Sequence, residues 1–346
     1  MNEYTFIDLF SGCGGMSLGF EQAGFTSLLA IDCWEDALIT YKYNRKDAKI
    51  LCADIENIDI ETLYLKDFKN TSVDLIIGGP PCQGFSIAGK RIVEDKRNTL
   101  YRSFVRFVEV FCPKAFVMEN VPNILSMAHG AIKDAIVRDF SKLGYDVVYK
   151  VLLAANFGVP QNRRRAFFVG ILNGPAFKFP SKSIVEPVTA YQALSDLCEG
   201  SIPNGSQYEV PAMSLFQEKM REGSKGVYNH QITQHTQKTI DTIALVPDGG
   251  NYKDLPKNLQ NTRKVNIAWT RLNSQRPSFT IDTGHRHHFH YQFNRVPTVR
   301  ESARLQSFPD RFIFIGGKGS QLKQVGNAVP PLLAQALAKA LLQQVF

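Results

Sequence analysis

The first half of the chain alternates between strand-like and helix-like segments, and this alternation constrains the fold more than any other feature. Short apolar segments that end at glycine, proline or a polar residue are followed by segments of helical length. We predict strands at 4–10, 26–32, 49–55, 73–81, 114–121, 146–154 and 164–172, and helices at 14–24, 34–44, 98–111 and 130–144. Alternation of this kind indicates an α/β protein with a doubly wound, mostly parallel sheet that has helices on both faces.

The alternation becomes unclear beyond residue 175, where Pro, Gly, Asn, Gln and Ser are frequent. Helical character returns at 298–308 and at 330–346, where two prolines begin a predicted C-terminal helix. A chain of 346 residues is also longer than one compact domain usually is. We therefore predict two domains, a discontinuous one formed by 1–175 and 297–346, and a smaller, irregular one at 176–296.

The apolar segments and the cysteines indicate in which cellular compartment the protein works. The N-terminal sequence lacks a basic segment followed by a long apolar run, and no apolar run approaches the ~18 residues of a membrane span. The 6 cysteines include no CxxC pair, which argues against a zinc site, and scattered cysteines of this kind are usually reduced in the cytoplasm. We expect a cytoplasmic monomer that is not bound to a membrane and holds no metal.

Basic residues are concentrated in one part of the chain. The net charge is +8, and the stretch 257–300 contains only one acidic residue, Asp282. Its eight basic residues are Lys257, Arg263, Lys264, Arg271, Arg276, Arg286, Arg295 and Arg300, and aromatic residues accompany them. The stretch is either a surface for a polyanion such as nucleic acid or a solvated basic face.

Glycines and acids follow the first three predicted strands. Gly12, Gly14 and Gly15 in "DLFSGCGG" lie between a strand and a helix, and Asp32 and Asp54 end the next two strands. Ligands bind at the carboxyl ends of such strands, where an acid can accept hydrogen bonds from a ribose or an adenine amino group. The pattern favours an adenosine cofactor, although the loop is not a full GxGxxG and a tight turn with two exposed acids is the alternative.

In the loop "GGPPCQGFS" at 78–86, two prolines directly precede Cys82, and glycines lie on both sides of it. A buried cysteine needs no such frame, whereas a nucleophile must be held close to its target atom. Downstream, Glu119 ends a strand in "MENV", and Arg163 and Arg165 lie on one side of the extended segment "QNRRR". These residues are either an active-site acid and an anion-binding pair or solvated charges.

In combination, these motifs make the sequence similar to the cytosine-5 DNA methyltransferases of bacterial restriction–modification systems. The resemblance runs through "DLFSGCGG", Asp32, "ADI", "GGPPCQGFS", "MENV", "QNRRR", "TVRESARLQSFPD" at 298–310 and "GNAVPP" at 326–331, in order. It implies a Rossmann-like methyltransferase domain, S-adenosylmethionine as methyl donor, double-stranded DNA as substrate and a cognate restriction endonuclease as functional partner. The domain at 176–296 would recognise the target, and the C-terminal helix would pack beside the first strand.

The resemblance also implies residue roles. The cofactor would contact Phe10, Ser11, Gly12, Gly14, Gly15, Asp32, Asp54, Ile55, Pro80, Leu100, Asn327 and Ala328. The Cys82 thiolate would add to carbon 6 of a flipped-out cytosine. Glu119 would supply a proton or a hydrogen bond at ring nitrogen 3, which requires a carboxyl pKa raised toward neutrality. Arg163 and Arg165 would hold the base carbonyl and the flanking backbone. Cys33 stands where some relatives carry an aromatic residue that stacks on adenine.

DNA contacts are expected from the loop that follows Cys82 and from the stretch 257–300, which would supply phosphate contacts. The polar, basic stretch 86–98 is predicted to be a mobile loop that closes on DNA, and "HRHHFH" at 285–290 is predicted to face DNA rather than to bind a metal. The DNA-binding candidates are Gln83, Ser86, Lys90, Arg91, Arg97, Arg271 and Arg286.

Three other functions compete with this one. A related domain methylates transfer RNA, but the Cys-Phe-Thr signature of those proteins does not occur here. A nucleotide-sensing module would have no use for Cys82 and Glu119 together, and the imperfect glycine loop argues against a nicotinamide dehydrogenase. The sequence identifies neither the recognised DNA site nor the base that removes the proton from carbon 5.

Overall fold

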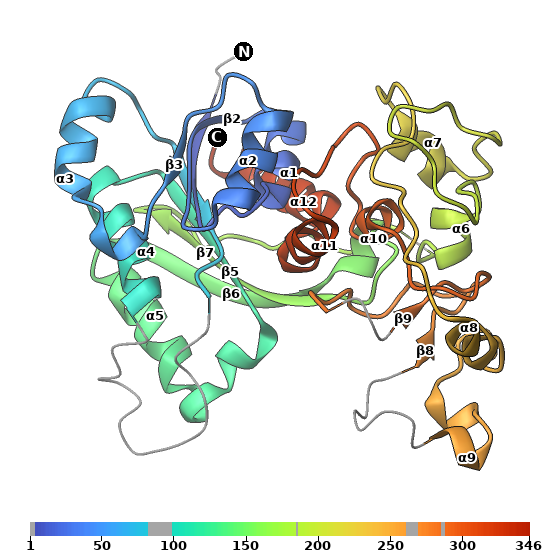
Figure 1. Cartoon of the computed structure of the whole chain (residues 1–346). Helices are drawn as coiled ribbons and strands as arrows, with labels where there is room; N and C mark the ends of the chain where they lie inside the picture. Colours follow the sequence, from blue (N-terminus) through green and yellow to red (C-terminus); the bar gives the residue numbers. More distant parts are fainter. Residues whose placement is uncertain (1–3, 82–98, 185, 261–268, 285–287) are drawn as a thin grey trace. The chain divides into compact units, whose positions relative to one another are not determined.

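The computed structural model describes residues 4–81, 99–184, 186–260, 269–284 and 288–346 (Figure 1). Several predictions fall on the remaining residues and lie outside the described part of the chain. These are the nucleophile Cys82, the loop 86–98, and the DNA-binding candidates Gln83, Ser86, Lys90, Arg91, Arg97 and Arg286.

A seven-stranded sheet occupies the N-terminal half of the chain, as the alternation predicts. Its strands are β1 (Thr5–Leu9), β2 (Thr26–Asp32), β3 (Ile50–Cys52), β4 (Leu75–Gly78), β5 (Ala115–Asn120), β6 (Tyr145–Leu153) and β7 (Arg164–Leu172), in the order β3-β2-β1-β4-β5-β7-β6. Neighbouring strands among the first five pair in parallel, whereas β7 is antiparallel to both β5 and β6. The mostly parallel sheet is therefore confirmed.

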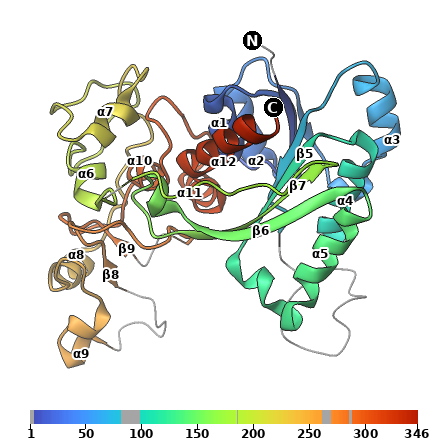
Figure 2. The ribbon, with the colours of Figure 1, turned by 180° about the vertical axis from the view of Figure 1, so that it is seen from behind.

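Helices cover both faces of this sheet, so the doubly wound arrangement is confirmed as well (Figures 1 and 2). They are α1 (Gly15–Ala23), α2 (Glu35–Asn44), α3 (Ile60–Leu63), α4 (Thr99–Phe111), α5 (Ala131–Ser141) and α12 (Pro331–Gln344), with short helical turns at Ile55–Asn57, Tyr64–Phe68, Pro122–Leu125 and Met127–Gly130. Ile7 of β1 packs in the core shared with α4 and α5, whereas its neighbour Phe6 packs against Phe20 of α1. This alternation follows from the period of two in a strand.

The C-terminal helix packs beside the first strand, as the resemblance implies. Tyr4, just before β1, donates a hydrogen bond of 2.7 Å to the Phe346 carbonyl, and the ring of Phe25 lies 5.5 Å from that of Phe346. The helical stretch Lys318–Gln344 is long and apolar enough to cross a membrane, but 67% of its most apolar window is buried inside the protein. It therefore has the character of a core helix.

The chain divides into two compact units. The first comprises Met1–Leu153, Arg164–Ser181 and Leu333–Phe346, and the second comprises Ala154–Arg163 and Lys182–Leu332. The first unit is discontinuous, and 297–332, which the sequence prediction assigns to the catalytic domain, lies in the second unit. The boundary also separates Arg163 from Arg165, which the sequence places in one motif.

The second unit is built from short elements. These are α6 (Ala190–Leu194), α7 (Leu215–Arg221), α8 (Gln237–Ala244), α9 (Lys257–Gln260), α10 (Val299–Leu305), α11 (Lys318–Asn327), the parallel pair β8 (Thr270–Arg271) and β9 (His288–Phe289), and helical turns at Ala154–Phe157 and Tyr252–Asp254. A small apolar core forms around Trp269, Phe289 and Ile243. The described elements within 176–296 have only two to eight residues and leave little periodicity, which explains why no elements could be predicted there.

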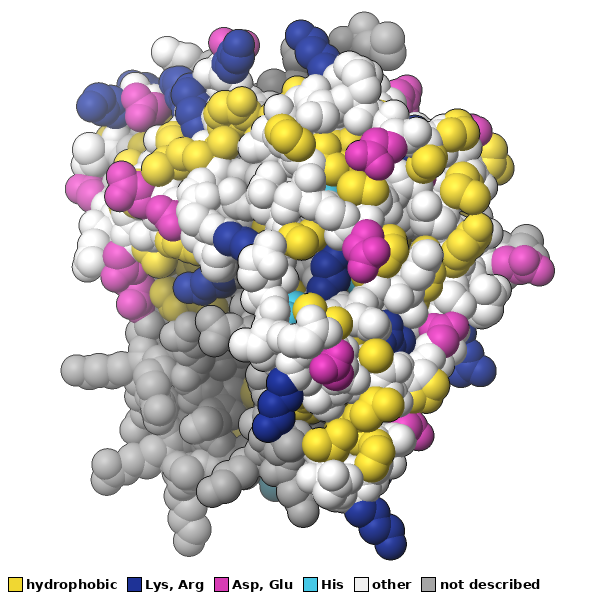
Figure 3. Space-filling view, turned by 45° about the vertical axis from the view of Figure 1, so that its right-hand side comes forward, with side chains coloured by type: hydrophobic (Ala, Val, Ile, Leu, Met, Phe, Trp, Pro, Cys, Tyr) yellow, Lys and Arg dark blue, Asp and Glu magenta, His cyan; other side chains and the backbone are white. Residues whose placement is uncertain are grey.

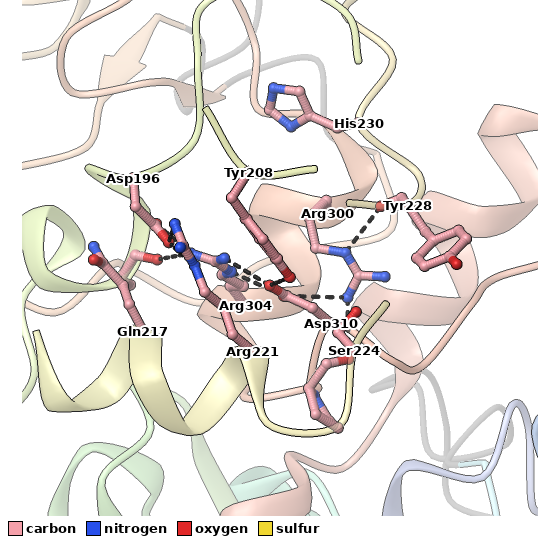
Figure 4. A network of polar contacts seen from close by, with 12 residues as sticks. Asp196, Tyr208, Gln217, Arg221, Ser224, Tyr228, His230, Arg300, Arg304 and Asp310 are labelled. Atoms are coloured by element: carbon pink, nitrogen blue, oxygen red, sulfur yellow. Dashed lines mark hydrogen bonds and ion pairs between the residues drawn. The ribbon is translucent and has the colours of Figure 1, made fainter. Parts of the chain in front are cut away.

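Buried ion pairs hold α10 within the second unit (Figure 4). Arg304 is fully buried, donates to both carboxylate oxygens of Asp310 at 2.9 and 2.6 Å, and also pairs with Asp196. Asp196 in turn accepts from Nε of Arg221 at 2.8 Å, and Asp310 accepts from the Tyr208 hydroxyl at 2.7 Å. Each buried charge thus has an opposite charge and further hydrogen bonds, which is the condition for a charge to be stable in a protein interior.

The strand order reverses between β1 and β4, and the chain backbones come unusually close there. A Cβ atom at Gly78 would lie 2.2 Å from the Leu9 carbonyl oxygen, so no side chain fits at this position. In open parallel sheets, ligands bind outside the carboxyl ends of the strands at such a reversal. The glycine loop after β1 and the Pro80–Pro81 loop after β4 both begin at this point.

Replacing Gly78 by alanine should lower the free energy of unfolding by about 2–3 kcal/mol, because the added methyl group must push β1 and β4 apart in a packed core. Gly200→Ala is the control, since a Cβ there would meet nothing within 4 Å. Chemical denaturation of the wild type and both variants checks this. Equal stability of the two variants would contradict the close approach.

Candidate functional site

The loop after β1 has an unusual backbone path. Phe10, Gly12 and Gly14 all have left-handed conformations, with φ of 58°, 53° and 87°. The Ser11 amide donates to the Ile31 carbonyl of β2 at 3.0 Å, and the Gly14 amide donates to the Ser11 carbonyl at 2.9 Å. A Cβ at Gly12 would meet no atom within 4 Å, so the loop is open on that side. Glycine suits these turns because it adopts left-handed conformations without strain.

Asp32 at the end of β2 fixes this loop. One carboxylate oxygen accepts from the Gly12 amide and the other from the Trp34 amide, both at 2.8 Å. Burial raises the pKa of Asp32, and these hydrogen bonds oppose that rise. Each carboxylate oxygen can accept a second hydrogen bond, so Asp32 can hold the loop and bind a ligand hydroxyl at once. The alternative of an unconstrained exposed acid therefore does not describe Asp32.

Other predicted cofactor residues follow the strands β1 and β3 or lie in α4. Asp54 is exposed after β3 and accepts from the Glu56 amide at 3.1 Å, while its neighbour Ile55 is buried. The Ser11 hydroxyl is buried and has no hydrogen-bond partner among the described residues. Leu100 of α4 packs against the core of the sheet. A polar ligand bound beside Gly12 could supply the hydrogen bond that the buried Ser11 hydroxyl lacks.

The chain leading to Cys82 is anchored from the neighbouring strand. The side-chain amide of Asn120, at the end of β5, donates to the Pro80 carbonyl at 2.9 Å, and its oxygen accepts from the Val121 amide at 2.8 Å. A Cβ at Gly79 would lie 2.9 Å from a carboxylate oxygen of Glu119. Asn120 is not among the site residues predicted from the sequence, although its place beside Glu119 in "MENV" is a usable signal.

Glu119 and Arg165, two of the predicted site residues, form an ion pair in the structure. Nε of Arg165 lies 2.8 Å from a carboxylate oxygen of Glu119, and their side chains are only 16% and 13% exposed. The contact follows from the antiparallel register of β5 and β7, in which Glu119 pairs with Phe167. This largely buried ion pair therefore places an acid and a cation next to Gly79 and Pro80, which precede Cys82 in the sequence.

Arg163 does not have the role predicted for it. Its side chain is 1% exposed and donates to the Ile281 carbonyl at 3.2 Å and to the Gly326 carbonyl at 2.9 Å, both within the second unit. A guanidinium buried on backbone carbonyls stabilises the segments that carry them and is not presented to a substrate. The expectation that it holds the base carbonyl is therefore corrected.

Arg271 is likewise not a DNA-binding residue. It is 5% exposed and donates to the Val246 carbonyl at 2.7 Å, to the Ile243 carbonyl at 2.6 Å and to the His290 carbonyl at 3.0 Å. These carbonyls lie in the last turn of α8, just after α8 and just after β9. Arg271 therefore acts as an internal brace of the second unit.

The basic stretch 257–300 is only partly at the surface. Arg295 and Arg300 are buried like Arg271, whereas Lys257 and Arg276 are exposed, and the other three basic residues lie outside the described part. On the face shown in Figure 3, the described Lys and Arg side chains are scattered among acidic and apolar ones. Of the five described basic residues of this stretch, the three buried ones are available neither to a nucleic acid nor to solvent.

The histidine cluster also differs from its prediction. His288 and His290 are 7% and 0% exposed, so these two do not face DNA, and His285 and His287 lie outside the described residues. Nδ1 of His290 accepts from the Gln292 amide at 3.1 Å, and burial lowers the pKa of His290 to about 4. Within the described chain, no three His, Cys, Asp or Glu side chains gather as metal ligands would.

A buried acid lies beneath the glycine loop. Asp8 of β1 is 1% exposed and accepts from the Ser17 hydroxyl at 2.5 Å, and burial raises the pKa of Asp8 to about 7. The Tyr41 hydroxyl lies 2.9 Å from that of Ser17. This chain of hydrogen bonds joins β1, α1 and α2 directly under the loop.

The raised pKa of Asp8 predicts a pH-dependent stability. The unfolded chain releases this proton near pH 3.8 and the folded chain near 7, so the Asp8 contribution is present below pH 3.8 and is lost as the pH rises to 7. Asp8→Asn should therefore become more stable relative to wild type by about 1.4 kcal/mol per pH unit between pH 4 and 7. Denaturant titrations at pH 5 and 7 test this, with the exposed Asp47→Asn as control. A difference that does not change with pH would contradict the raised pKa.

The chain is similar to known proteins over nearly its whole length. Residues 4–343 match the family model for the C-5 cytosine-specific DNA methylase. The chain is 41% identical over 343 residues to the type II methyltransferase M1.HphI of Haemophilus parahaemolyticus, covering 98% of this chain and 87% of that protein. It is 42% identical over 366 residues to M.DdeI of Desulfomicrobium norvegicum, covering 96% and 87%. A crystal structure from Escherichia coli, described as a DNA modification methyltransferase encoded within a prophage, is 28% identical with a TM-score of 0.80 and 99% coverage of both chains. The chain therefore belongs to the C-5 cytosine-specific DNA methylase family.

Proposed function

We propose that this protein transfers a methyl group from S-adenosylmethionine to carbon 5 of a flipped-out cytosine in a specific double-stranded DNA sequence. The observation that carries the proposal is the Glu119–Arg165 pair, which lies beside the anchored Gly79–Pro80 segment immediately before Cys82. This reaction needs an acid and a cation beside the base and a thiol as nucleophile, and Glu119, Arg165 and Cys82 are proposed for these roles. A nucleotide sensor or a nicotinamide dehydrogenase needs none of them.

Cys82 makes carbon 5 reactive. Its thiolate adds to carbon 6, and the electron pair of the 5,6 double bond becomes available at carbon 5, which then takes the methyl group. A base removes the proton from carbon 5, and the thiolate leaves as the double bond forms again. The addition divides one difficult step into two easier ones, as in other covalent catalysis.

Glu119 and Arg165 stabilise the base during the addition. Electron density moves toward ring nitrogen 3 as the thiolate adds, and a carboxyl group there can supply a proton or a hydrogen bond. Arg165 keeps Glu119 in place, and the guanidinium has further N–H groups for the base carbonyl. Because Arg163 is buried on backbone carbonyls, Arg165 alone is proposed for this role.

Residues of the first unit fit the adenosine cofactor. S-adenosylmethionine, when bound, supplies the electrophilic methyl group. The Ser11 hydroxyl would gain its missing partner, Asp32 would accept from the ribose, and Asp54 with Ile55 would contact the adenine. Gly12 leaves the open space that a bound ligand requires. Asn327 and Ala328 of the second unit are proposed cofactor contacts on the resemblance.

The cellular role is proposed from the relatives, which are named as type II methyltransferases. Methylation would protect DNA from a cognate restriction endonuclease that recognises the same sequence in the cytoplasm. We propose that the protein acts as a monomer and that 176–296 contains the residues that recognise the target. Loss of DNA binding with increasing salt would report how many phosphates the protein contacts.

Incubation of the purified protein with radiolabelled S-adenosylmethionine tests the proposal, with duplex DNA and transfer RNA as competing substrates. We expect label in duplex DNA only, and bisulfite sequencing then maps the modified cytosine. Label in transfer RNA alone would favour the RNA-modifying alternative. Cofactor binding without any transfer would favour a sensing module.

A conservative change at Arg165 should reduce turnover strongly. Arg165→Gln removes the charge beside Glu119 and should lower kcat about 100-fold, as the loss of one electrostatic stabiliser commonly does. Arg164→Gln is a matched control, because this neighbouring arginine is exposed. Steady-state rates at saturating DNA and cofactor check the prediction. Equal rates in the two variants would remove Arg165 from the mechanism.

A further inference from the structure

A cluster formed by Glu21, Arg45 and Tyr41 contacts the glycine loop at Gly14, whereas Asp32 contacts it at Gly12. We propose that Arg45 is a positioning residue of the cofactor site, which holds the 12–15 loop in the conformation that receives the adenosine cofactor. The inference rests on the proposed function, because it concerns the same cofactor. Sequence reasoning gave no signal for Arg45, since it follows a surface helix and belongs to none of the recognised motifs.

Arg45 is held in one orientation by three groups. Its Nε lies 2.7 and 2.8 Å from the two carboxylate oxygens of Glu21, and its Nη2 donates to the Gly14 carbonyl at 2.9 Å. The guanidinium carbon lies 4.3 Å from the centre of the Tyr41 ring. With an exposed fraction of 9%, the Arg45 side chain is well shielded from water, which strengthens each of these interactions.

Gly14 is the point where this cluster meets the loop. It precedes α1 in a left-handed conformation, and its carbonyl also accepts the first helical hydrogen bond, from Leu18 at 2.9 Å. A Cβ at Gly14 would lie 2.6 Å from the Tyr41 ring and 2.7 Å from Nη1 of Arg45. The backbone at Gly14 is thus pressed against Tyr41 and Arg45.

The loop is therefore fixed at two points. Asp32 holds the Gly12 amide, Arg45 holds the Gly14 carbonyl, and Ser11 with its unpartnered hydroxyl precedes the first of these points. Without Arg45, the residues between the two points would sample more conformations, and cofactor binding would have to order them. Such ordering weakens binding without changing the contacts in the bound state.

A merely structural role for Arg45 predicts something different. If it only joined α1 to the end of α2, its loss would reduce stability and all activities together. A positioning role predicts weaker cofactor binding with nearly normal turnover once cofactor saturates the site. Glu21 is 26% exposed and can be solvated when its partner is removed, so variants at Arg45 should still fold.

The experiment compares Arg45→Met and Arg45→Lys with Arg106→Met, which removes an exposed arginine that lies 3.8 Å from Glu61. Dissociation constants for S-adenosylmethionine are measured by calorimetry, together with KM and kcat for each substrate. For Arg45→Met we expect a Kd and a KM for cofactor about 10- to 100-fold higher, with kcat at saturating cofactor and the Kd for DNA nearly unchanged. Arg45→Lys should lie between, because an ammonium group cannot serve Glu21 and Gly14 in the same planar geometry. Arg106→Met should match the wild type.

Two results separate the possible failures. Wild-type protein that binds no S-adenosylmethionine would overturn the proposed function and this inference with it. If Arg45→Met binds S-adenosylmethionine as tightly as the wild type does, this inference alone is overturned. It is also overturned if Arg45→Met loses kcat and melting temperature together. If Arg45→Met does not fold, the cofactor Kd of Arg45→Lys decides, with an increase of about 5-fold or more expected.

Discussion

Replacing Cys82 by serine should reduce DNA methylation by at least about 10⁴-fold, because removal of a covalent nucleophile leaves only binding and electrostatic effects to act on the base. A serine hydroxyl has a far higher pKa than a thiol and does not add to carbon 6 at neutral pH. The variant should still bind DNA and cofactor, since the cofactor contacts proposed here lie on other residues. Transfer of radiolabel from S-adenosylmethionine to duplex DNA measures the loss.

Cys112→Ser provides the control for this substitution, since Cys112 is an exposed cysteine at the end of α4, outside the proposed site. It should methylate DNA at the wild-type rate. A Cys82→Ser protein that retained wild-type activity would show that the reaction does not pass through this thiol.

Replacing Arg304 by methionine should lower the free energy of unfolding by about 3–5 kcal/mol, because it leaves the buried carboxylates of Asp196 and Asp310 without their shared partner. Arg221 and Tyr208 can compensate only in part, since each contacts one of the two acids. The effect should concern the second unit first. Chemical denaturation combined with hydrogen exchange of α10 would locate it.

Arg311→Met is the matched control, because this exposed arginine of the same region donates only one described hydrogen bond, of 3.0 Å, to the Glu222 carbonyl. We expect a loss within about 0.5 kcal/mol. A comparable loss of unfolding free energy in both variants would contradict the stabilising role of the buried Arg304 ion pairs. In the double variant Arg304→Met with Asp310→Asn, the loss should be smaller than the sum of the single losses, since the two residues contact each other.

Most of the sheet and its helices could be predicted because the longer elements are regularly patterned, whereas the four-residue α3 is not predicted. The predicted strand 26–32 and the observed β2 coincide, and the predicted helices 34–44 and 98–111 begin within one residue of α2 and α4. Parallel strands buried on both faces are continuous apolar runs, and glycines and acids end them at the edge where ligands bind. This is why the positions of Asp32 and Glu119 at the ends of strands could also be predicted.

Arginine burial could not be predicted, since a residue's charge does not reveal its surroundings. Arg271 and Arg163 were assigned to ligands because they lie in basic stretches, yet both donate to carbonyls that are distant in sequence. Arg304 pairs with Asp196 across 108 positions of the chain. Arg45 was missed for the same reason, since its partners Gly14 and Glu21 precede it by a whole strand and helix.

The most direct test of the covalent mechanism uses duplex DNA that carries 5-fluorocytosine at the target position. Fluorine at carbon 5 cannot leave as a proton does, so the protein should stop after methyl transfer with Cys82 still joined to carbon 6. Mass spectrometry of the digested complex should then find the methylated, fluorinated nucleotide attached to the peptide that contains Cys82. Tight binding and methylation of ordinary DNA with no such attachment, or attachment to another residue, would contradict the account.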